Sequence, residues 1–237
     1  MVESASILET LHAHDLGRMA FEPAYNRQCA EVERVLAARE TSRPIAGTIL
    51  LVEHAPVITI SQRPTARRHL TATPEALAGA GVRVVETDRG GDITYHGPGQ
   101  LVVYPILDLN ALGLRLHEYM RLLENALIEV CRGLGMDAGR DTCATGVWVR
   151  GAKVCAMGVR VRRWVSMHGL ALNVNPDLRH FDLIVPCGLA GRGVTSLQRE
   201  LGAACPAMPR VKDAVVQSLR ARLHEHVSQR AARPTRV

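Results

Sequence analysis

The sequence has few aromatic residues: two Trp, two Phe and four Tyr make up 3% of its 237 residues. Its core must therefore be mainly aliphatic, and few rings remain to stack nucleic-acid bases. It also lacks any apolar run near the roughly 18 residues of a membrane-spanning helix. The N-terminus lacks the basic-then-apolar layout of a secretion signal. These absences predict a cytoplasmic protein that binds neither membrane nor nucleic acid, while the net charge of +6 suits an acidic partner.

Lysine is scarce as well, since only Lys153 and Lys212 occur among 29 basic residues. Arginine evidently serves wherever a generic positive charge is needed. A retained lysine is then a candidate for a role that arginine cannot fill, because arginine does not lose its proton in proteins. Lys153 stands in GAKVCAMG, where its neighbours are small or apolar. The alternative is a charge at a strand edge that reaches solvent.

None of the six cysteines is spaced as C-x-x-C, and no H-x-H or H-E-x-x-H pattern occurs, so no metal site is predicted. Cys187 differs from the others because it lies between Pro186 and Gly188 in a glycine-rich segment. Glycine lets a substrate approach the backbone closely, which makes Cys187 a candidate nucleophile rather than an ordinary loop thiol. A nucleophilic thiol needs a base or cation beside it. The candidates for that role are Lys153, His96, His168 and His180.

Periodicity and turn residues predict an α+β fold, in which helices pack on a mixed or antiparallel sheet. The predicted helices are 23–40, 73–81, 115–134 and 209–227. The predicted strands are 47–54, 57–61, 81–87, 101–109 and three consecutive strands within 146–174, with long loops at 89–100 and 175–193. We expect a single domain over residues 1–227 and a mobile, Arg-rich tail over 228–237.

The segment RGGDITYHGPGQ (89–100) is the second candidate site. Its paired glycines, Gly90 and Gly91, permit a tight turn whose backbone can hydrogen-bond a ligand. It lacks the GK[ST] ending of a phosphate loop and the G-x-G-x-x-G pattern of a dinucleotide site. The alternative is a long turn between strands, in which His96 is a structural histidine.

Three ordered motifs resemble the octanoyltransferase family of lipoate biosynthesis. They are RGGDITYHGPGQLVVY (89–104), GAKVCAMGVRVRRWVSMHGLALNV (151–174) and IVPCGLAGRGVTSL (184–197), within a resemblance that covers roughly residues 16–202. The resemblance implies a fold similar to the catalytic domain of biotin and lipoate protein ligases. It also implies an acyltransferase without a cofactor, which passes octanoyl from acyl carrier protein through a cysteine thioester to a lysine. The acceptors implied are lipoyl domains of 2-oxoacid dehydrogenase complexes and the glycine cleavage H protein.

Matched motif by motif, Cys187 falls on the acyl-bearing cysteine of that family and Lys153 on the lysine that activates it. The implied substrate-binding residues are Arg89, Gly90, Gly91, Asp92, Ile93, Thr94, Tyr95, His96, Ala156, Met157, Gly158, Gly169, Leu170 and Ala171. One departure is Cys155, two positions after Lys153, which places a second thiol on the same face of a strand. Cys187 remains the favoured nucleophile because Cys155 lies in a strand interior.

Two other functions fit parts of this pattern. An ATP-dependent lipoate or biotin ligase of the same fold would also use a lysine at position 153, but it proceeds through an adenylate and needs no thiol. A non-catalytic protein that binds lipoyl domains or acyl chains would need neither residue. Cys187 therefore separates the transferase from both alternatives.

Overall fold

The computed structural model describes residues 7–41, 43–142, 144–186 and 192–232. Its strands are β1 (His12–Met19), β2 (Gly47–His54), β3 (Val57–Ser61), β4 (Arg83–Thr87), β5 (Ile93–His96), β6 (Gln100–Leu107), β7 (Ala138–Gly139), β8 (Val147–Val149), β9 (Ala152–Arg162) and β10 (Val165–Asn173). The α-helices are α2 (Phe21–Arg39), α3 (Pro74–Gly79), α4 (Leu116–Gly133), α5 (Leu197–Leu201) and α6 (Met208–Ala232). Short 3₁₀ helices cover Ile7–Thr10, Ala66–His69, Leu178–Leu183 and Gly202–Ala204.

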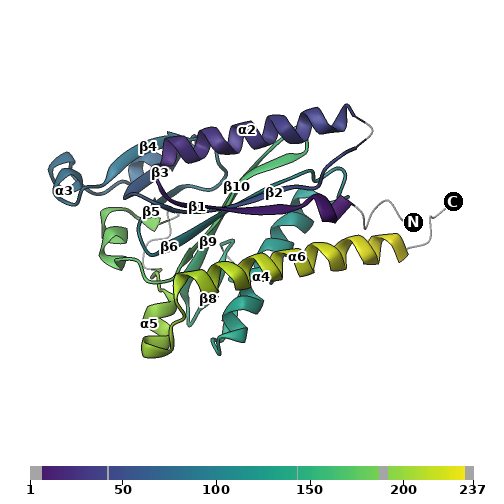
Figure 1. Cartoon of the computed structure of the whole chain (residues 1–237). Helices are drawn as coiled ribbons and strands as arrows, with labels where there is room; N and C mark the ends of the chain where they lie inside the picture. Colours follow the sequence, from purple (N-terminus) through teal and green to yellow (C-terminus); the bar gives the residue numbers. More distant parts are fainter. Residues whose placement is uncertain (1–6, 42, 143, 187–191, 233–237) are drawn as a thin grey trace.

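A seven-stranded sheet forms the middle layer, in the order β1-β2-β6-β10-β9-β8-β7. β1 and β2 are parallel, and every other neighbouring pair is antiparallel. Figure 1 shows α2 along one face of this sheet and α4 and α6 on the other. Each face carries its own cluster of buried aliphatic side chains. The predicted α+β class, with a mixed sheet and helices packed on it, is thus confirmed.

A three-stranded sheet, β4-β3-β5, lies at the end of the molecule where α2 begins (Figure 1). β3 pairs with β4 in parallel and with β5 in antiparallel orientation. A third apolar cluster joins this sheet to the 3₁₀ helix Leu178–Leu183 through Ile58, Ile93, Tyr95 and Phe181. The small sheet is therefore anchored independently of the two main clusters.

Three strands escaped sequence-based prediction: β1, β5 and the two-residue β7. β5 lies inside the segment 89–100 that we expected to be a loop, although all four of its residues are buried. The glycines on both sides of β5 make the segment resemble a loop in the sequence, whereas its pairing with β3 stabilises it as a strand. β1 is a mostly exposed edge strand of mixed polarity, whose pairing with β2 shifts register around Gly17. Neither β1 nor β5 carries the alternation by which a half-buried strand is recognised.

The helices agree more closely with expectation. The predicted helix 115–134 is α4, and Thr73 accepts a hydrogen bond from the Ala76 N–H at the start of α3. The last helix runs to Ala232, so it extends five residues into the segment that we expected to be a tail. In the part of the chain that the structure describes, no helix is both long and apolar enough to cross a membrane.

Arg39, the last residue of α2, connects three elements. Its Nε and second guanidinium nitrogen donate to both carboxylate oxygens of Asp108, at 2.5 and 2.7 Å. Its remaining nitrogen donates to the carbonyl of Arg163, at the tip of the β9–β10 hairpin, at 2.5 Å. Asp108 follows β6 and is 1% exposed. This bidentate pair thus fixes the end of α2 over the large sheet.

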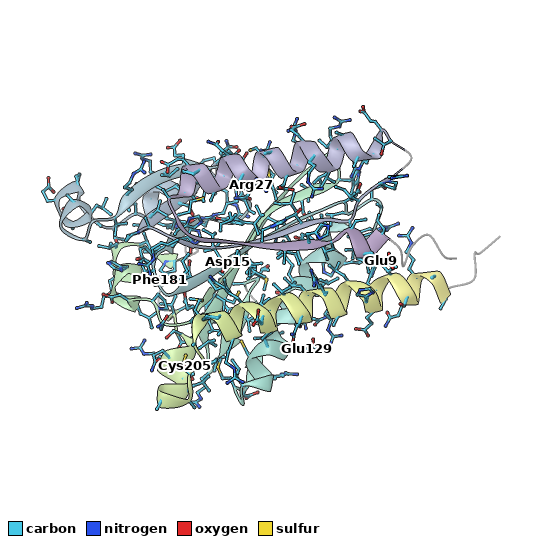
Figure 2. All side chains as sticks on the ribbon, viewed as in Figure 1. Glu9, Asp15, Arg27, Glu129, Phe181 and Cys205 are labelled. Atoms are coloured by element: carbon cyan, nitrogen blue, oxygen red, sulfur yellow. The ribbon has the colours of Figure 1, made fainter. Side chains whose placement is uncertain are left out.

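We expect Arg39→Ala to lower the free energy of unfolding by about 2–4 kcal/mol, because it leaves the buried Asp108 carboxylate without its cation. For a chain of this size the melting temperature should fall by roughly 5–10 °C, as calorimetry would measure. Arg27→Ala is the matched control on the same helix (Figure 2), since Arg27 is half exposed and its partner Glu31 keeps the ion pair with Arg34. Its loss should cost about 1 kcal/mol or less. Equal losses in both variants would contradict the assigned role of Arg39.

Candidate active site

A narrow cleft opens where the small sheet meets the large one. The cleft extends from β9 across β10 to β6, two strand spacings or about 10 Å. The first helical residue of α2, Phe21, lies on the β6 side. The lining residues are Phe21, Arg89, Gly91, Asp92, Ile93, Thr94, His96, Val102, Tyr104, Ala156, Met157, Gly158, His168, Gly169, Leu170 and Ala171.

Twelve of the fourteen predicted substrate-binding residues line this cleft; Gly90 and Tyr95 do not. Gly90 instead joins the loop to β9, and Tyr95 stacks on His180 at a ring distance of 4.8 Å, within the small sheet's own packing. The structure thus brings three segments that are distant in sequence to one cavity. Substrate binding by these residues stays a prediction.

Close backbone contacts shape the cleft. The Gly90 N–H donates to the Val159 carbonyl on β9 at 2.9 Å. A Cβ on Gly158 would stand only 2.4 Å from the Gly90 carbonyl oxygen, so no larger residue fits there without displacing the loop. Arg89 holds the same loop from the other side, because its guanidinium donates to the Thr59 carbonyl on β3 at 2.8 Å.

The pairing of β10 with β6 lapses beside the cleft. Regular pairing covers Leu170–Asn173 and resumes as a single bridge between Val165 and Asp108. Between them lies Pro105, which has no N–H to donate. The Ser166 hydroxyl replaces ladder bonds there, since it donates to the Pro105 carbonyl at 2.8 Å and accepts from the Leu107 N–H at 3.0 Å.

His168 lies in this irregular stretch with a φ of +56°, which is uncommon for a residue other than glycine. Its Nε2 donates to Asp88 at 2.8 Å. The Asp88 carboxylate also accepts from the Tyr25 hydroxyl at 2.9 Å and from Arg160. Burial lowers the pKa of His168, although Asp88 opposes the shift. The three donors lower the pKa of Asp88 despite its partial burial.

Two further histidines stand by the cleft as neutral rings. His96 donates from Nδ1 to the Gln100 side-chain oxygen at 2.7 Å, and burial lowers its pKa to about 3. His54 donates from Nδ1 to the Met19 carbonyl, so its Nε2 accepts from the Tyr104 hydroxyl at 2.7 Å. Burial lowers the pKa of His54 to about 4. Sequence reasoning considered His96 but missed His54, because a single histidine at the end of a strand has no distinguishing pattern.

Asp92 has a partner that sequence reasoning also missed. His69 donates from Nδ1 to its carboxylate at 2.6 Å, and the carbonyl of His69 accepts from the Val185 N–H at 2.7 Å. The chain therefore reaches position 185 beside the Arg89–His96 segment. No sequence signal relates residue 69 to residues 92 and 185, because the contact depends on the packing of the small sheet.

Lys153 is 6% exposed and lies near the start of β9. Its N–H donates to the Gly193 carbonyl at 2.9 Å, and its carbonyl accepts from the Thr195 N–H at 3.0 Å. Its ammonium stands 4.8 Å from the centre of the Trp148 ring. The alternative of a strand-edge charge that reaches solvent is therefore wrong. Lys153 is not among the residues that line the cleft.

A chain of hydrogen bonds nevertheless joins Lys153 to the cleft. Gln100, which accepts from His96, donates to the Asn173 side chain at 2.9 Å. Asn173 in turn donates to the Thr195 carbonyl at 2.9 Å, and the Thr195 N–H reaches Lys153. The position of Lys153 relative to His96 is thereby fixed through three buried side chains and one backbone unit.

Cys187 lies outside the described residues, as does Cys143. Cys155 and Cys131 are buried in the main core; burial raises the pKa of Cys155, and it raises that of Cys131 to about 12. The half-buried Cys205 lies before α6 (Figure 2), and burial raises its pKa too. These three thiols are poor nucleophiles. Among the described residues, no cluster of three or more His, Cys, Asp or Glu is arranged to hold a metal ion.

Comparisons with known proteins identify relatives of this chain. The family model of the lipoyl protein ligase A/B catalytic domain matches residues 25–220. A protein of Chloroflexus aggregans named octanoyltransferase is 48% identical over 90% of this chain and 94% of its own length. An octanoyltransferase of Bacteroides fragilis is 45% identical over 86% of this chain and 93% of its own.

Solved structures show the same fold at low sequence identity. A putative lipoate protein ligase of Thermoplasma acidophilum with bound lipoic acid has a TM-score of 0.65 at 15% identity, covering 90% of this chain and 85% of that one. The biotin protein ligase of Aquifex aeolicus has a TM-score of 0.52 at 12% identity, covering 92% and 71%. The expected fold, that of the catalytic domain of these ligases, is confirmed.

The buried histidines predict a loss of stability in mild acid. In the unfolded chain His54 and His96 take up protons below pH 6.5 or so, whereas the folded protein keeps them neutral down to pKa values of about 4 and about 3. Stability should therefore fall as the pH drops through 6.5 and continue to fall toward pH 4. Each histidine should cost on the order of 1–2 kcal/mol by pH 5.

Urea unfolding at pH 7, 6 and 5 measures this effect. His54→Gln preserves one donor and one acceptor and should reduce the acid loss. His117→Gln, at an exposed position of α4, is the matched control and should leave it unchanged. A midpoint that stays constant from pH 7 to pH 5 would rule out neutral buried histidines.

Proposed function

The chain belongs to the lipoyl protein ligase A/B catalytic domain family and, within it, to the octanoyltransferases, which are acyltransferases. From this membership we propose that it transfers octanoyl from acyl carrier protein to a specific lysine of lipoyl domains, through a thioester on Cys187. The acceptors are the lipoyl domains of 2-oxoacid dehydrogenase complexes and the glycine cleavage H protein. Such a protein works in the cytoplasm, where carrier and acceptors are found.

One observation carries the assignment of the reacting pair. Lys153 is hydrogen-bonded through its N–H to Gly193 and through its carbonyl to Thr195, which follow Cys187 by six and eight positions. On the other side of Cys187, Val185 is bonded to His69, the partner of Asp92 in the cleft. The described residues that flank Cys187 thus run from the cleft wall to Lys153, which supports a meeting of the two side chains.

The reaction requires no ATP, because its donor is already a thioester. The Cys187 thiol gives its proton to Lys153 and attacks the carbonyl carbon of octanoyl. A new C–S bond forms, the bond to the carrier's sulfur breaks, and the carrier thiolate takes a proton from Lys153. The acceptor lysine's amine then attacks the enzyme thioester, forms the amide and releases the Cys187 thiol. Lysine suits this exchange because it can lose and regain a proton.

The cleft suits the alkyl chain. Its walls are largely aliphatic or glycine, and neither the lining residue His96 nor the neighbouring His54 carries a charge near neutral pH. With the carbonyl end toward Lys153 on β9, the methyl end points across the sheet toward Phe21 and Tyr104. Each buried methylene contributes about 0.8 kcal/mol, which is enough to discriminate between chain lengths.

The decisive measurement is the intact mass of the protein after incubation with octanoyl carrier protein without ATP. We expect an added octanoyl group in the wild type and in Cys155→Ala, and none in Cys187→Ala. Cys155 is the matched control because it is the other thiol near Lys153, although its burial raises its pKa. An octanoyl group that persists in Cys187→Ala and disappears in Cys155→Ala would reverse the assignment.

Two arms of the same assay separate the alternatives. Transfer to a lipoyl domain without ATP excludes a ligase that needs an adenylate, whereas strict ATP dependence would exclude the proposed transferase. Lys153→Arg keeps the positive charge but not the exchangeable proton. Its activity should fall by a factor of about 10² or more. Full activity in that variant would mean that Lys153 contributes only its positive charge and exchanges no proton.

Phe21→Ala should relax the preference for eight carbons, because it removes the wall that faces the methyl end. The ratio of kcat/KM for decanoyl over octanoyl carrier protein should rise roughly tenfold, from two more buried methylenes. Phe181→Ala is the matched control, since Phe181 (labelled in Figure 2) is similarly buried but belongs to the small sheet's cluster and does not line the cleft. An unchanged ratio in Phe21→Ala would place the methyl end elsewhere.

A further inference from the structure

Trp148 occupies an unusual position beside Lys153. It is one of only two tryptophans in the chain, and it is 5% exposed on the short strand β8. Its ring nitrogen donates to the Ala144 carbonyl at 3.0 Å, which fixes the orientation of the indole. Two cations then stand against its ring: the Lys153 ammonium at 4.8 Å from the centre and the Arg192 guanidinium carbon at 4.6 Å.

The contact with Lys153 is built into the sheet. Trp148 and Lys153 are directly paired in the β8–β9 register, and the irregularity in β8 falls between Val147 and Trp148. Side chains of directly opposed residues lie about 5 Å apart at Cβ. Gly146 also lies beside the lysine, since a Cβ there would stand 3.5 Å from Lys153 Cε. The lysine stem therefore has both a glycine and an indole ring as neighbours.

The second cation comes from a different part of the chain. Arg192 is five positions after Cys187 and next to Gly193, which accepts the Lys153 N–H. Its guanidinium also pairs with Asp141, between β7 and β8. Asp141 offsets the charge of Arg192, and the indole ring attracts both cations, because the electron-rich face of an indole binds cations more strongly than other aromatic side chains do.

We infer that Trp148 is a positioning residue of the acyl transfer: its indole ring holds the Lys153 ammonium and the Arg192 guanidinium together, and so fixes residues 192–195, which come shortly after Cys187 in the chain, relative to Lys153. This inference rests on the proposed roles of Lys153 and Cys187. Backbone bonds join the two segments at Gly193 and Thr195, and the ring adds a side-chain contact to both. An aliphatic residue at position 148 would fill space without attracting either cation.

Fluorinated tryptophans test this directly, because fluorine withdraws electrons from the ring face and hardly alters its shape. Trp164, at the hairpin tip, is 51% exposed, so Trp164→Phe should retain wild-type activity and leave Trp148 as the sole tryptophan. Incorporation of mono-, di- and trifluorotryptophan should then lower kcat stepwise, by roughly tenfold in total. KM for octanoyl carrier protein should change little, since Trp148 does not line the cleft.

Trp148→Phe with the same analogues is the matched control, since fluorine then occurs only at Trp164 and kcat should not depend on it. A kcat that stays constant across the Trp148 series would overturn the inference, because a purely structural ring is indifferent to its electron density. A second readout needs no substrate. In the single-tryptophan protein, Lys153→Met and Arg192→Met should each shift the fluorescence emission of Trp148, and unchanged emission in both would also overturn the inference.

These readouts separate the two levels of the assignment. If the fluorescence emission of Trp148 shifts in these variants but the wild-type protein is never acylated, the proposed reaction is wrong and the cation contacts are supported. If Cys187 is acylated normally but kcat does not change with the fluorination of Trp148, the proposed reaction is supported and the role of Trp148 is wrong.

Discussion

The backbone contact between Gly90 and Gly158 determines where the cleft can exist. It brings the loop after β4 against β9, with the Gly90 N–H bonded to Val159 and no room for a Cβ on Gly158. One wall of the cleft then comes from this loop and β5, and the floor from β6, β9 and β10. Because glycine alone tolerates the approach, the distance between the two sheets is set by backbone atoms and not by flexible side chains.

Electrostatics divides the site into two regions. On the side of β6, His54 and His96 are neutral because burial lowers the pKa of each. The Asp88 carboxylate accepts hydrogen bonds from His168, Tyr25 and Arg160. At the start of β9, the cations Lys153 and Arg192 gather against one indole ring. In the proposed reaction the alkyl chain lies in the first region, and the proton exchange at the carbonyl takes place in the second. The hydrogen-bond chain from His96 through Gln100, Asn173 and Thr195 holds the two regions at a fixed separation.

The elements that sequence reasoning predicted are those whose pattern is local. α4 has apolar residues at helical spacing, and β8, β9 and β10 are separated by evident turns, so each is recognisable from its own residues. β5 and β1 were missed because their stability comes from a partner strand. Ile93–His96 is buried only since β3 lies beside it, and the polar strand His12–Met19 is ordered by its parallel pairing with β2. Pairing of this kind leaves no periodic trace in the strand itself.

The sequence by itself determined the chemistry-bearing residue types: a lysine retained among arginines, a thiol between proline and glycine, and a glycine-rich segment around His96. These are consequences of side-chain chemistry and backbone freedom, which a residue carries wherever it is placed. The tertiary structure alone decided which side chains come into contact. It joined His168 to Asp88 across 80 positions and His69 to Asp92 across 23, and it put Trp148 opposite Lys153. Such pairs follow from sheet register and layer packing, which are properties of the whole chain, so no local pattern announces them.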